Sequence, residues 1–500
     1  MRLRLEGAIS EHSKRLRSLH AMSLKKKILS GGAWALGGKL VSIVCAVLLN
    51  LMLTRGLSPA DYGAYFVCLN TVIILVTVGT LGMDQIAIRL VAVATSTGNR
   101  TLVRKIALRC LGIVTVAAAI VTLSLALGSH WLFAQQMKMP QVVASTVVVS
   151  LWLFFSTLQR QIAETFRGLS DIRLATVFGG MRNSGFLINT IVCVSTACFT
   201  FAGALTLGRV FGIWALGTAV VLLVSLAVLK QKIRSPPGTI ERLPDPSNVA
   251  SVRTGHLLSE GWPLGLSLLV TVLNNQGVGW LAGKFDIPEH VALFGLAQQF
   301  VILAITPMVI GNSIVPPIIA ELYNRGELTR LERVAQSIAA LFSIPSAGLF
   351  LLLLFVGHAL LGTLFGAFYY NAYPLVLILC AGQVANVATG TWQFVLPMAG
   401  QKNQMLLLSL FSASLQVVTG IVGGHYWGVY GVAWAFCLSM VVSNLAGMIV
   451  VRRRLGIWTF VWLDRKILVE IVSMVKSKLS RRRAGGDPAE CTVPGSKEVL

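Results

Sequence analysis

Charged side chains are scarce in this 500-residue chain. Only 12% of its residues are Asp, Glu, Lys or Arg, whereas about 25% is usual for a soluble protein. Polar stretches between apolar segments are short, and the mean hydropathy is +0.76. The apolar residues form runs of about twenty, which is the length that crosses the hydrocarbon core of a bilayer. These features exclude an ordinary soluble fold and predict a polytopic membrane protein.

Motifs for metal, cofactor or nucleotide chemistry are also missing. The eight cysteines include no Cys-x-x-Cys pair, and most lie in apolar runs, which is typical of packing residues. Segment 32–39 resembles a phosphate-binding loop, but Ala33 replaces its first glycine and Leu40 stands where Ser or Thr is required. We therefore expect no metal, no cofactor and no ATP hydrolysis by the chain itself. The short outer loops argue against an enzyme.

Basic charge is plentiful, and its placement predicts the membrane topology. The formal net charge is +23, but the Lys and Arg residues gather at the two ends and in alternate loops, as the positive-inside rule describes. With a cytoplasmic N-terminus, the outer loops keep only Arg55, Lys138 and Lys284. We therefore expect both ends in the cytoplasm and no nucleic-acid partner.

The apolar runs predict about twelve transmembrane helices in an all-α fold. The expected spans are 31–54, 64–86, 106–128, 141–159, 174–199, 205–229, 262–283, 291–317, 335–362, 372–398, 405–424 and 428–451.

These spans predict two six-helix lobes. The expected segments are a basic cytoplasmic tail at 1–30, an N-lobe at 31–229, a cytoplasmic linker at 230–256, a C-lobe at 257–452 and a basic amphipathic cytoplasmic tail at 453–500. Trp34–Gly37 resembles Trp262–Gly265, and both copies run in the same membrane direction. Such a parallel repeat predicts that substrate is held between the lobes.

Local motifs resemble a known family over about residues 25–455. Segment 53–63, Leu-Thr-Arg-Gly-Leu-Ser-Pro-Ala-Asp-Tyr-Gly, resembles the "ARxLGPxxYG" turn of polysaccharide flippases in the multidrug/oligosaccharidyl-lipid/polysaccharide (MOP) exporter superfamily. Further matches are 81–89, 166–169, 314–322 and 364–369. Thr54 replaces the usual Ala, and 291–294 replaces the common "VGxY".

The resemblance implies a MOP/MATE-like fold and a flippase in the bacterial inner membrane. Its substrate would be an isoprenoid-diphosphate-linked oligosaccharide, moved from the cytoplasmic to the periplasmic leaflet for exopolysaccharide or O-antigen synthesis. The other implied partners are membrane lipids, a coupling ion (H⁺ or Na⁺) and polysaccharide polymerase or export machinery. Two alternatives remain open: a multidrug cation antiporter of the same superfamily, and a membrane glycosyltransferase or polymerase.

Four basic residues are candidate substrate ligands. Lys39 lies within the first expected span, where a cation normally faces a cavity, and we expect it to contact the diphosphate. The alternative is that its side chain snorkels to the interface. Arg182 and Arg209 in spans five and six, and Arg55 in an outer turn, are candidates with anchoring or structural roles as their alternatives. For Asp84 and Arg89 we expect a local ion pair.

Carboxamides in the C-lobe are the second set of candidates, because amides bind sugar hydroxyls or join helices. The candidate ligands are Asn275, Gln276, Gln298 and Gln299, with Asn274, Gln383, Asn386 and Gln393 as further polar positions. In the same region Gly277 and Gly279 predict a hinge on which the second lobe rocks. The alternative is that these glycines permit close helix packing.

Overall fold

The computed structural model describes residues 37–179, 185–233, 254–311, 315–389 and 391–461. Within these ranges the regular secondary structure is helical and contains no strand. Nine of the described helices are long and apolar enough to cross a membrane, so the chain is an all-α polytopic membrane protein, as predicted. The tail at 1–30, most of the linker at 230–256 and most of the tail at 453–500 lie outside the described residues.

The first half contains ten described helices. Their bounds are Gly37–Gly56, α2 Pro59–Thr80, α3 Met83–Ser96, α4 Arg100–Ser129, the π-helix η1 His130–Gln136, α5 Pro140–Val143, α6 Thr146–Gly168, α7 Ile172–Val177, α8 Phe186–Phe201 and α9 Leu207–Lys232.

The second half begins at α11. Its helices are α11 Thr254–Phe285, α12 Pro288–Gly311, α13 Val315–Asn324, α14 Leu328–Phe365, the 3₁₀-helix η3 Ala367–Ala372, α15 Tyr373–Thr389, α16 Trp392–Met398 and α17 Lys402–Leu455.

Predicted spans four and five correspond to α6 and α8, which are not among the nine described helices that are long and apolar enough to cross a membrane. The last two predicted spans lie together in the single helix α17. Helix α6 carries the polar triplet 159–161, which lowers its hydropathy, and α8 has only 16 residues. Helix α17 has 54 residues and turns at Gly428, whose φ of 55° and ψ of −136° are not helical. A φ in this region suits glycine. The backbones of Gly423 and Gly431 meet across the turn, so α17 contains predicted spans eleven and twelve.

Several predicted boundaries were wrong. Span four was expected to end at residue 159, but α6 continues to Gly168. Spans eight and ten were expected to reach residues 317 and 398, but α12 ends at Gly311 and α15 at Thr389. At the end of span eight, Pro316 lies in the first turn of the separate helix α13, where a proline is tolerated although it would break a helix interior.

The predicted second span is broken at its inner end. Leu81 and Gly82 both have left-handed backbone angles, φ 48° and 75°, and they separate α2 from α3. A Cβ on Gly82 would lie 2.1 Å from the carbonyl oxygen of Gly261 on α11. Glycine is therefore required here both for the turn and for backbone contact with the second half.

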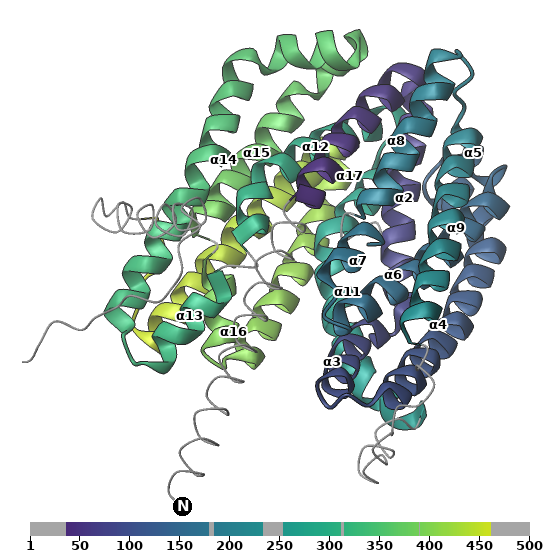
Figure 1. The fold of residues 1–500 in the computed structure, drawn as a ribbon. Coiled ribbons are helices and arrows are strands. Elements are labelled where there is room, and N and C mark those ends of the chain that lie inside the picture. Colours follow the sequence, from purple (N-terminus) through teal and green to yellow (C-terminus); the bar gives the residue numbers. More distant parts are fainter. Residues whose placement is uncertain (1–36, 180–184, 234–253, 312–314, 390, 462–500) are drawn as a thin grey trace, which may run out of the picture.

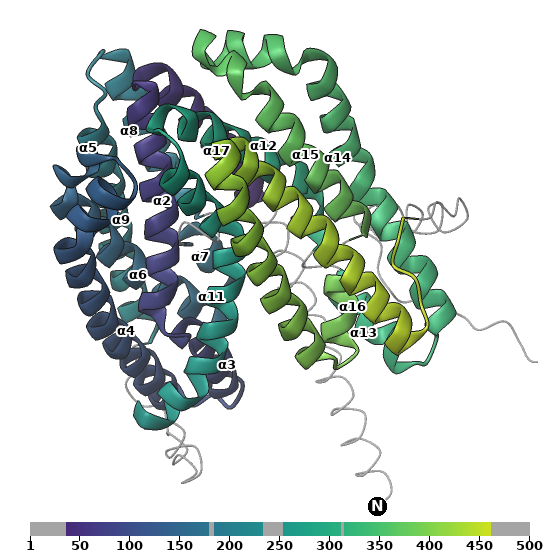
Figure 2. The same ribbon diagram turned by 180° about the vertical axis from the view of Figure 1, so that it is seen from behind.

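The helices form two groups joined through α2, α11 and α12. Figures 1 and 2 show α4 to α9 on one side of the molecule and α13 to α17 on the other. Helix α2 packs against α11 and α12, and these two pack in turn against α17 and α15. A large core cluster extends through this junction, and a smaller one lies where α13, α14, α16 and α17 meet.

Candidate functional site: a neutral polar cavity

A cavity of about 450 Å³ lies among α2, α11, α12, α15, α16 and α17. Carboxamides and hydroxyls dominate its polar lining. The polar lining residues are Asn70, Thr271, Asn274, Asn275, Gln276, Gln298, Gln299, Gln383, Asn386, Gln393, Ser409, Ser412, Gln416, Ser439, Ser443 and Asn444. Among the described lining residues none has an ionisable side chain. The cavity is therefore polar but neutral.

Apolar side chains form the larger part of the cavity surface. Phe66, Trp392, Met405 and Phe436 are among them. A neutral cavity with aromatic faces and many fixed amides and hydroxyls suits a polar, uncharged ligand, because each buried polar group of the ligand needs a partner.

Part of the lining is fixed by hydrogen bonds between α11 and α17. The side-chain amide of Asn274 donates to the carbonyl oxygen of Ser409 at 3.3 Å, and Gln416 Nε2 donates to the carbonyl oxygen of Asn274 at 3.0 Å. The Asn275 amide donates to the carbonyl oxygen of Thr271 on its own helix at 2.7 Å. These bonds hold the wall that α11 and α17 share.

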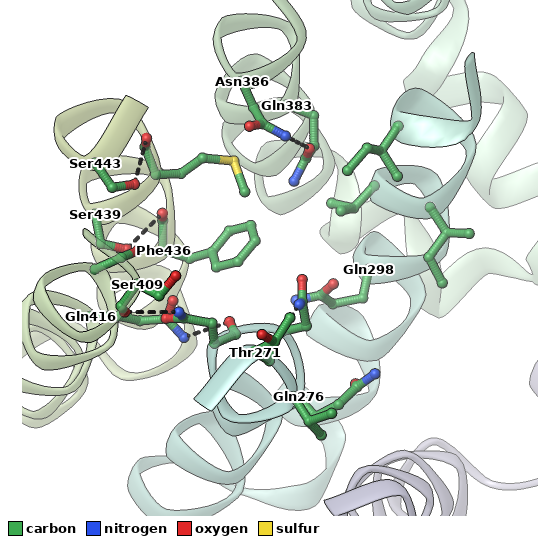
Figure 3. A pocket seen from close by; sticks show the side chains of 18 of the residues that line it. Thr271, Gln276, Gln298, Gln383, Asn386, Ser409, Gln416, Phe436, Ser439 and Ser443 are labelled. Atoms are coloured by element: carbon green, nitrogen blue, oxygen red, sulfur yellow. Dashed lines mark hydrogen bonds between the residues drawn. The ribbon is translucent and has the colours of Figure 1, made fainter. Parts of the chain in front are cut away.

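A second hydrogen-bonded chain connects α16, α17 and α15. Trp392 Nε1 donates to Asn444 Oδ1 at 2.7 Å, and Asn444 Nδ2 donates to Asn386 Oδ1 at 3.0 Å. Asn386 Nδ2 then donates to Gln383 Oε1 at 3.1 Å, and Figure 3 shows this last bond. All four side chains are buried and line the cavity.

The structure brings the predicted carboxamides together. Asn275, Gln276, Gln298 and Gln299 all line the cavity, and Figure 3 shows Gln276 and Gln298 on its α11 and α12 walls. Asn274, Gln383, Asn386 and Gln393 line it as well. That these amides bind substrate remains a prediction.

The predicted basic residues lie elsewhere. Lys39 is half-buried in the first described turn of the helix Gly37–Gly56, beside α7, because a Cβ on its neighbour Gly38 would meet Thr176. Arg209 is exposed near the start of α9 and donates to the carbonyl oxygen of Ala204. Arg182 lies outside the described residues. None of the described basic residues lines the neutral cavity.

Arg55 joins the ends of two helices from different halves. Its Nε donates to the carbonyl oxygen of Leu364 at 2.7 Å, and its NH2 group donates to that of Thr363 at 2.6 Å. Both acceptors lie in the last turn of α14, where carbonyls lack helical partners. A cation there also complements the helix dipole, so Arg55 acts as a cap between the halves in this conformation.

The two predicted hinge glycines differ in their surroundings. A Cβ on Gly279 would lie 2.5 Å from Asn70 Nδ2 and 3.2 Å from Phe66, whereas a Cβ on Gly277 would meet nothing within 4 Å. Both lie inside the continuous helix α11. Gly279 therefore permits close packing of α11 on α2, and the hinge remains a prediction that rests on Gly277.

A buried ion pair in the first half was missed by the sequence reasoning. Arg160 on α6 contacts Asp84 Oδ2 through its NH2 group at 2.7 Å and its Nε at 3.1 Å, and its NH1 group donates to Thr77 at 3.1 Å. Arg160 is 6% exposed and Asp84 is 0% exposed. The expected Asp84–Arg89 pair was wrong, since Arg89 pairs with Glu260 on α11.

One signal for this pair was visible in the sequence. Four polar residues follow one another closely at the end of the predicted fourth span, at positions 159, 160, 161 and 164. An extra helical turn would have placed Arg160 inside the bundle, where a charge requires a partner. In the described parts of the chain, no group of three His, Cys, Asp or Glu residues could hold a metal ion.

A family model described as "Polysaccharide biosynthesis protein" matches residues 28–322, which is more than half of the chain. The chain therefore belongs to this family of polysaccharide biosynthesis proteins. No curated protein matches the chain significantly.

Solved structures of several transporters have folds similar to that of this chain. The inward-facing form of a MATE multidrug resistance transporter of the MOP superfamily has a TM-score of 0.69 at 15% identity, covering 83% of this chain and 94% of its own. The lipid II flippase MurJ in an inward closed conformation gives 0.62 at 12% identity, covering 85% and 87%. A MATE transporter from Vibrio cholerae gives 0.57 at 15% identity, covering 87% and 97%.

Proposed function

We propose that this chain is a flippase for an isoprenoid-diphosphate-linked oligosaccharide in the inner membrane of a bacterium. It moves the oligosaccharide from the cytoplasmic to the periplasmic leaflet for synthesis of exopolysaccharide or O-antigen. The observation that carries this proposal is the neutral cavity of carboxamides and hydroxyls in the second half. Membership of the polysaccharide biosynthesis family supports it.

A cavity of this kind lowers the barrier to moving sugars across a bilayer. Sugar hydroxyls that enter hydrocarbon lose their hydrogen bonds to water, which costs several kcal/mol for each unpaired group. Amides and hydroxyls of the lining replace those bonds, while Phe66, Trp392 and Phe436 offer apolar faces. The isoprenoid chain stays in the bilayer, where it is already soluble.

The diphosphate requires positive charge that the cavity itself does not offer among its described residues. We assign this role to Lys39, which lies on the first helix of the opposite half. The sugar and the diphosphate would then bind to different halves of the molecule. Rocking of the halves would move both groups together.

The neutral lining argues against the alternative of a multidrug cation antiporter. A cationic drug would be bound by carboxylates or a dense aromatic cage, and the described lining contains no carboxylate. In the first half, the buried carboxylate of Asp84 is already paired with Arg160. A glycosyltransferase or polymerase is disfavoured because the similar solved folds are those of transporters.

The decisive experiment reconstitutes the protein in liposomes with a fluorescent undecaprenyl-diphosphate-linked oligosaccharide from a bacterium that makes a surface polysaccharide. Access of a soluble glycosidase or a membrane-impermeant quencher reports the leaflet of the sugar. We expect protein-dependent movement of the sugar to the other leaflet. Transport of ethidium without any movement of the lipid-linked sugar would support the antiporter instead.

A further inference from the structure

The hydrogen-bonded chain from Trp392 to Gln383 has a fixed direction. An indole N–H can only donate, so Asn444 must turn its oxygen toward Trp392. Its amide nitrogen is then left to donate to Asn386, and Asn386 in turn donates to Gln383. Carboxamides can otherwise be rotated by 180° to exchange donor and acceptor. The Asn444 amide nitrogen also donates to the carbonyl oxygen of Met440 at 2.9 Å, so the indole and this carbonyl together fix the orientation of all three amides.

The free end of this chain is a pair of N–H donors. Gln383 Oε1 accepts the bond from Asn386, and within the described residues Gln383 Nε2 has no hydrogen-bond partner. The Gln383 side chain is only 1% exposed and lines the cavity. Figure 3 shows its nitrogen directed into the open space. Successive hydrogen bonds polarise one another, which strengthens the last donor.

Helix α17, which packs against α15, presents acceptors. The hydroxyls of Ser409, Ser439 and Ser443 donate to carbonyl oxygens of their own helix at 2.9, 3.1 and 3.1 Å. Each hydroxyl has one hydrogen, so only its oxygen lone pairs remain for a ligand. The cavity thus has donors on α15 and acceptors on α17.

We propose that Gln383 binds the carbonyl oxygen of an acyl group on the sugar, such as an N-acetyl group, while sugar hydroxyls donate to the serines of α17. This inference rests on the proposed function, because it specifies which sugar chemistry the same cavity selects. An acyl oxygen is an acceptor without a hydrogen and matches two free donors. A hydroxyl can also accept from these donors, but its hydrogen must then find an acceptor of its own, and a carboxylate would place a charge in a neutral cavity.

The test measures sugar binding to the purified protein in lipid nanodiscs by saturation-transfer difference NMR, with N-acetylglucosamine, glucose and glucuronate as probes. We expect wild-type protein to bind N-acetylglucosamine about fivefold more tightly than the other two, the scale of one neutral hydrogen bond. Gln383→Met keeps the volume but removes both donors. It should abolish this preference by lowering the affinity for N-acetylglucosamine to about that for glucose.

Asn386→Leu tests the orientation itself. Without the Asn386 amide, which donates to Gln383 Oε1, the Gln383 amide can rotate and present its oxygen to the cavity, so the preference for the acetylated sugar should fall toward that of Gln383→Met. Asn50→Leu is the matched control, because the Asn50 amide accepts from the Tyr62 hydroxyl at 2.8 Å and Asn50 is not among the described lining residues. It should keep the preference.

The outcomes separate this inference from the proposed function. Equal binding of glucose and N-acetylglucosamine by wild-type protein, or an unchanged preference in both Gln383→Met and Asn386→Leu, would overturn the role of Gln383 and leave a sugar-binding cavity. Tighter binding of glucuronate would assign the donors to a carboxylate instead and also overturn the proposal. Binding of none of the three sugars, in protein that elutes as a single species, would overturn both.

Discussion

The two halves of this protein treat buried polar groups in different ways. In the first half, Arg160 and Asp84 neutralise each other within 2.7 Å and also hold α6 against α2 and α3. In the second half, uncharged amides and hydroxyls surround an open cavity. The two charges of a buried ion pair neutralise each other, whereas an amide can keep donors or acceptors free for a ligand. The first half thus uses its buried charges to hold helices together, whereas the second half leaves donors and acceptors open to the cavity.

The largest effect is expected from breaking the buried pair. Arg160→Met leaves the Asp84 carboxylate without its partner, and such a loss destabilises proteins by about 3–5 kcal/mol. We expect the variant to lose most folded protein from the membrane, measured by fluorescence-detected size-exclusion chromatography after a heating series. The double variant Arg160→Met with Asp84→Leu removes both charges and should recover much of the stability. A stable single variant would show that the pair does not hold the first half together.

Transport should respond most strongly to Lys39. If this side chain contacts the diphosphate, Lys39→Ala should reduce flipping in proteoliposomes by about tenfold or more, since a hydrogen bond to a charged group contributes about 1.5–3 kcal/mol. Lys39→Arg should retain part of the rate. Arg209→Ala is a suitable control, because Arg209 is exposed and bonds to the backbone near its own helix. A normal rate in Lys39→Ala would leave Lys39 as an interfacial anchor.

Sequence reasoning predicted the helical membrane fold because each apolar run is long enough to be recognised on its own. It also selected Asn275, Gln276, Gln298 and Gln299, since buried amides in a span are unusual, and the structure places all four around one cavity. It could not find the bond between Arg160 and Asp84, because 76 residues separate them and the end of α6 was placed too early. The orientation of the Gln383 amide depends on hydrogen bonds among α15, α16 and α17, and no local sequence pattern encodes such contacts.

Gly277 and Gly279 of α11 form a matched pair of positions for testing the contact between the two halves. Gly279→Ala would force its Cβ against Asn70 and Phe66, and such overpacking costs about 1–3 kcal/mol. Gly277→Ala meets open space, so the better helix propensity of alanine should stabilise α11 by up to about 1 kcal/mol. Thermal melting in detergent checks both. If Gly277→Ala is stable but slows flipping, Gly277 acts as the hinge, whereas normal transport would reject the hinge.

The smallest expected effect lies at the surface of the first half, where a charge caps a helix. Asp171 accepts from the backbone N–H of Leu174 at the start of α7 and pairs with Lys232 at the end of α9. Partial burial acts to raise the pKa of this carboxyl, but the bonds from Lys232 and Leu174 outweigh it and hold the pKa below its usual value of 3.8.

Because the pKa of Asp171 is lower in the folded state, the charge stabilises the fold above about pH 4, and this contribution is lost as the pH falls through the folded pKa. Asp171→Asn keeps the cap but removes the charge, so it should lower the stability by less than about 1 kcal/mol at pH 7 and by a smaller amount at pH 3. Melting temperatures at the two pH values measure this difference. Asn99, which caps α4 through Leu102 at 2.9 Å, provides the neutral control, and Asn99→Ala should cost about 1 kcal/mol at both pH values. An equal loss at pH 7 and pH 3 for Asp171→Asn would show that the ion pair with Lys232 contributes nothing to the first half.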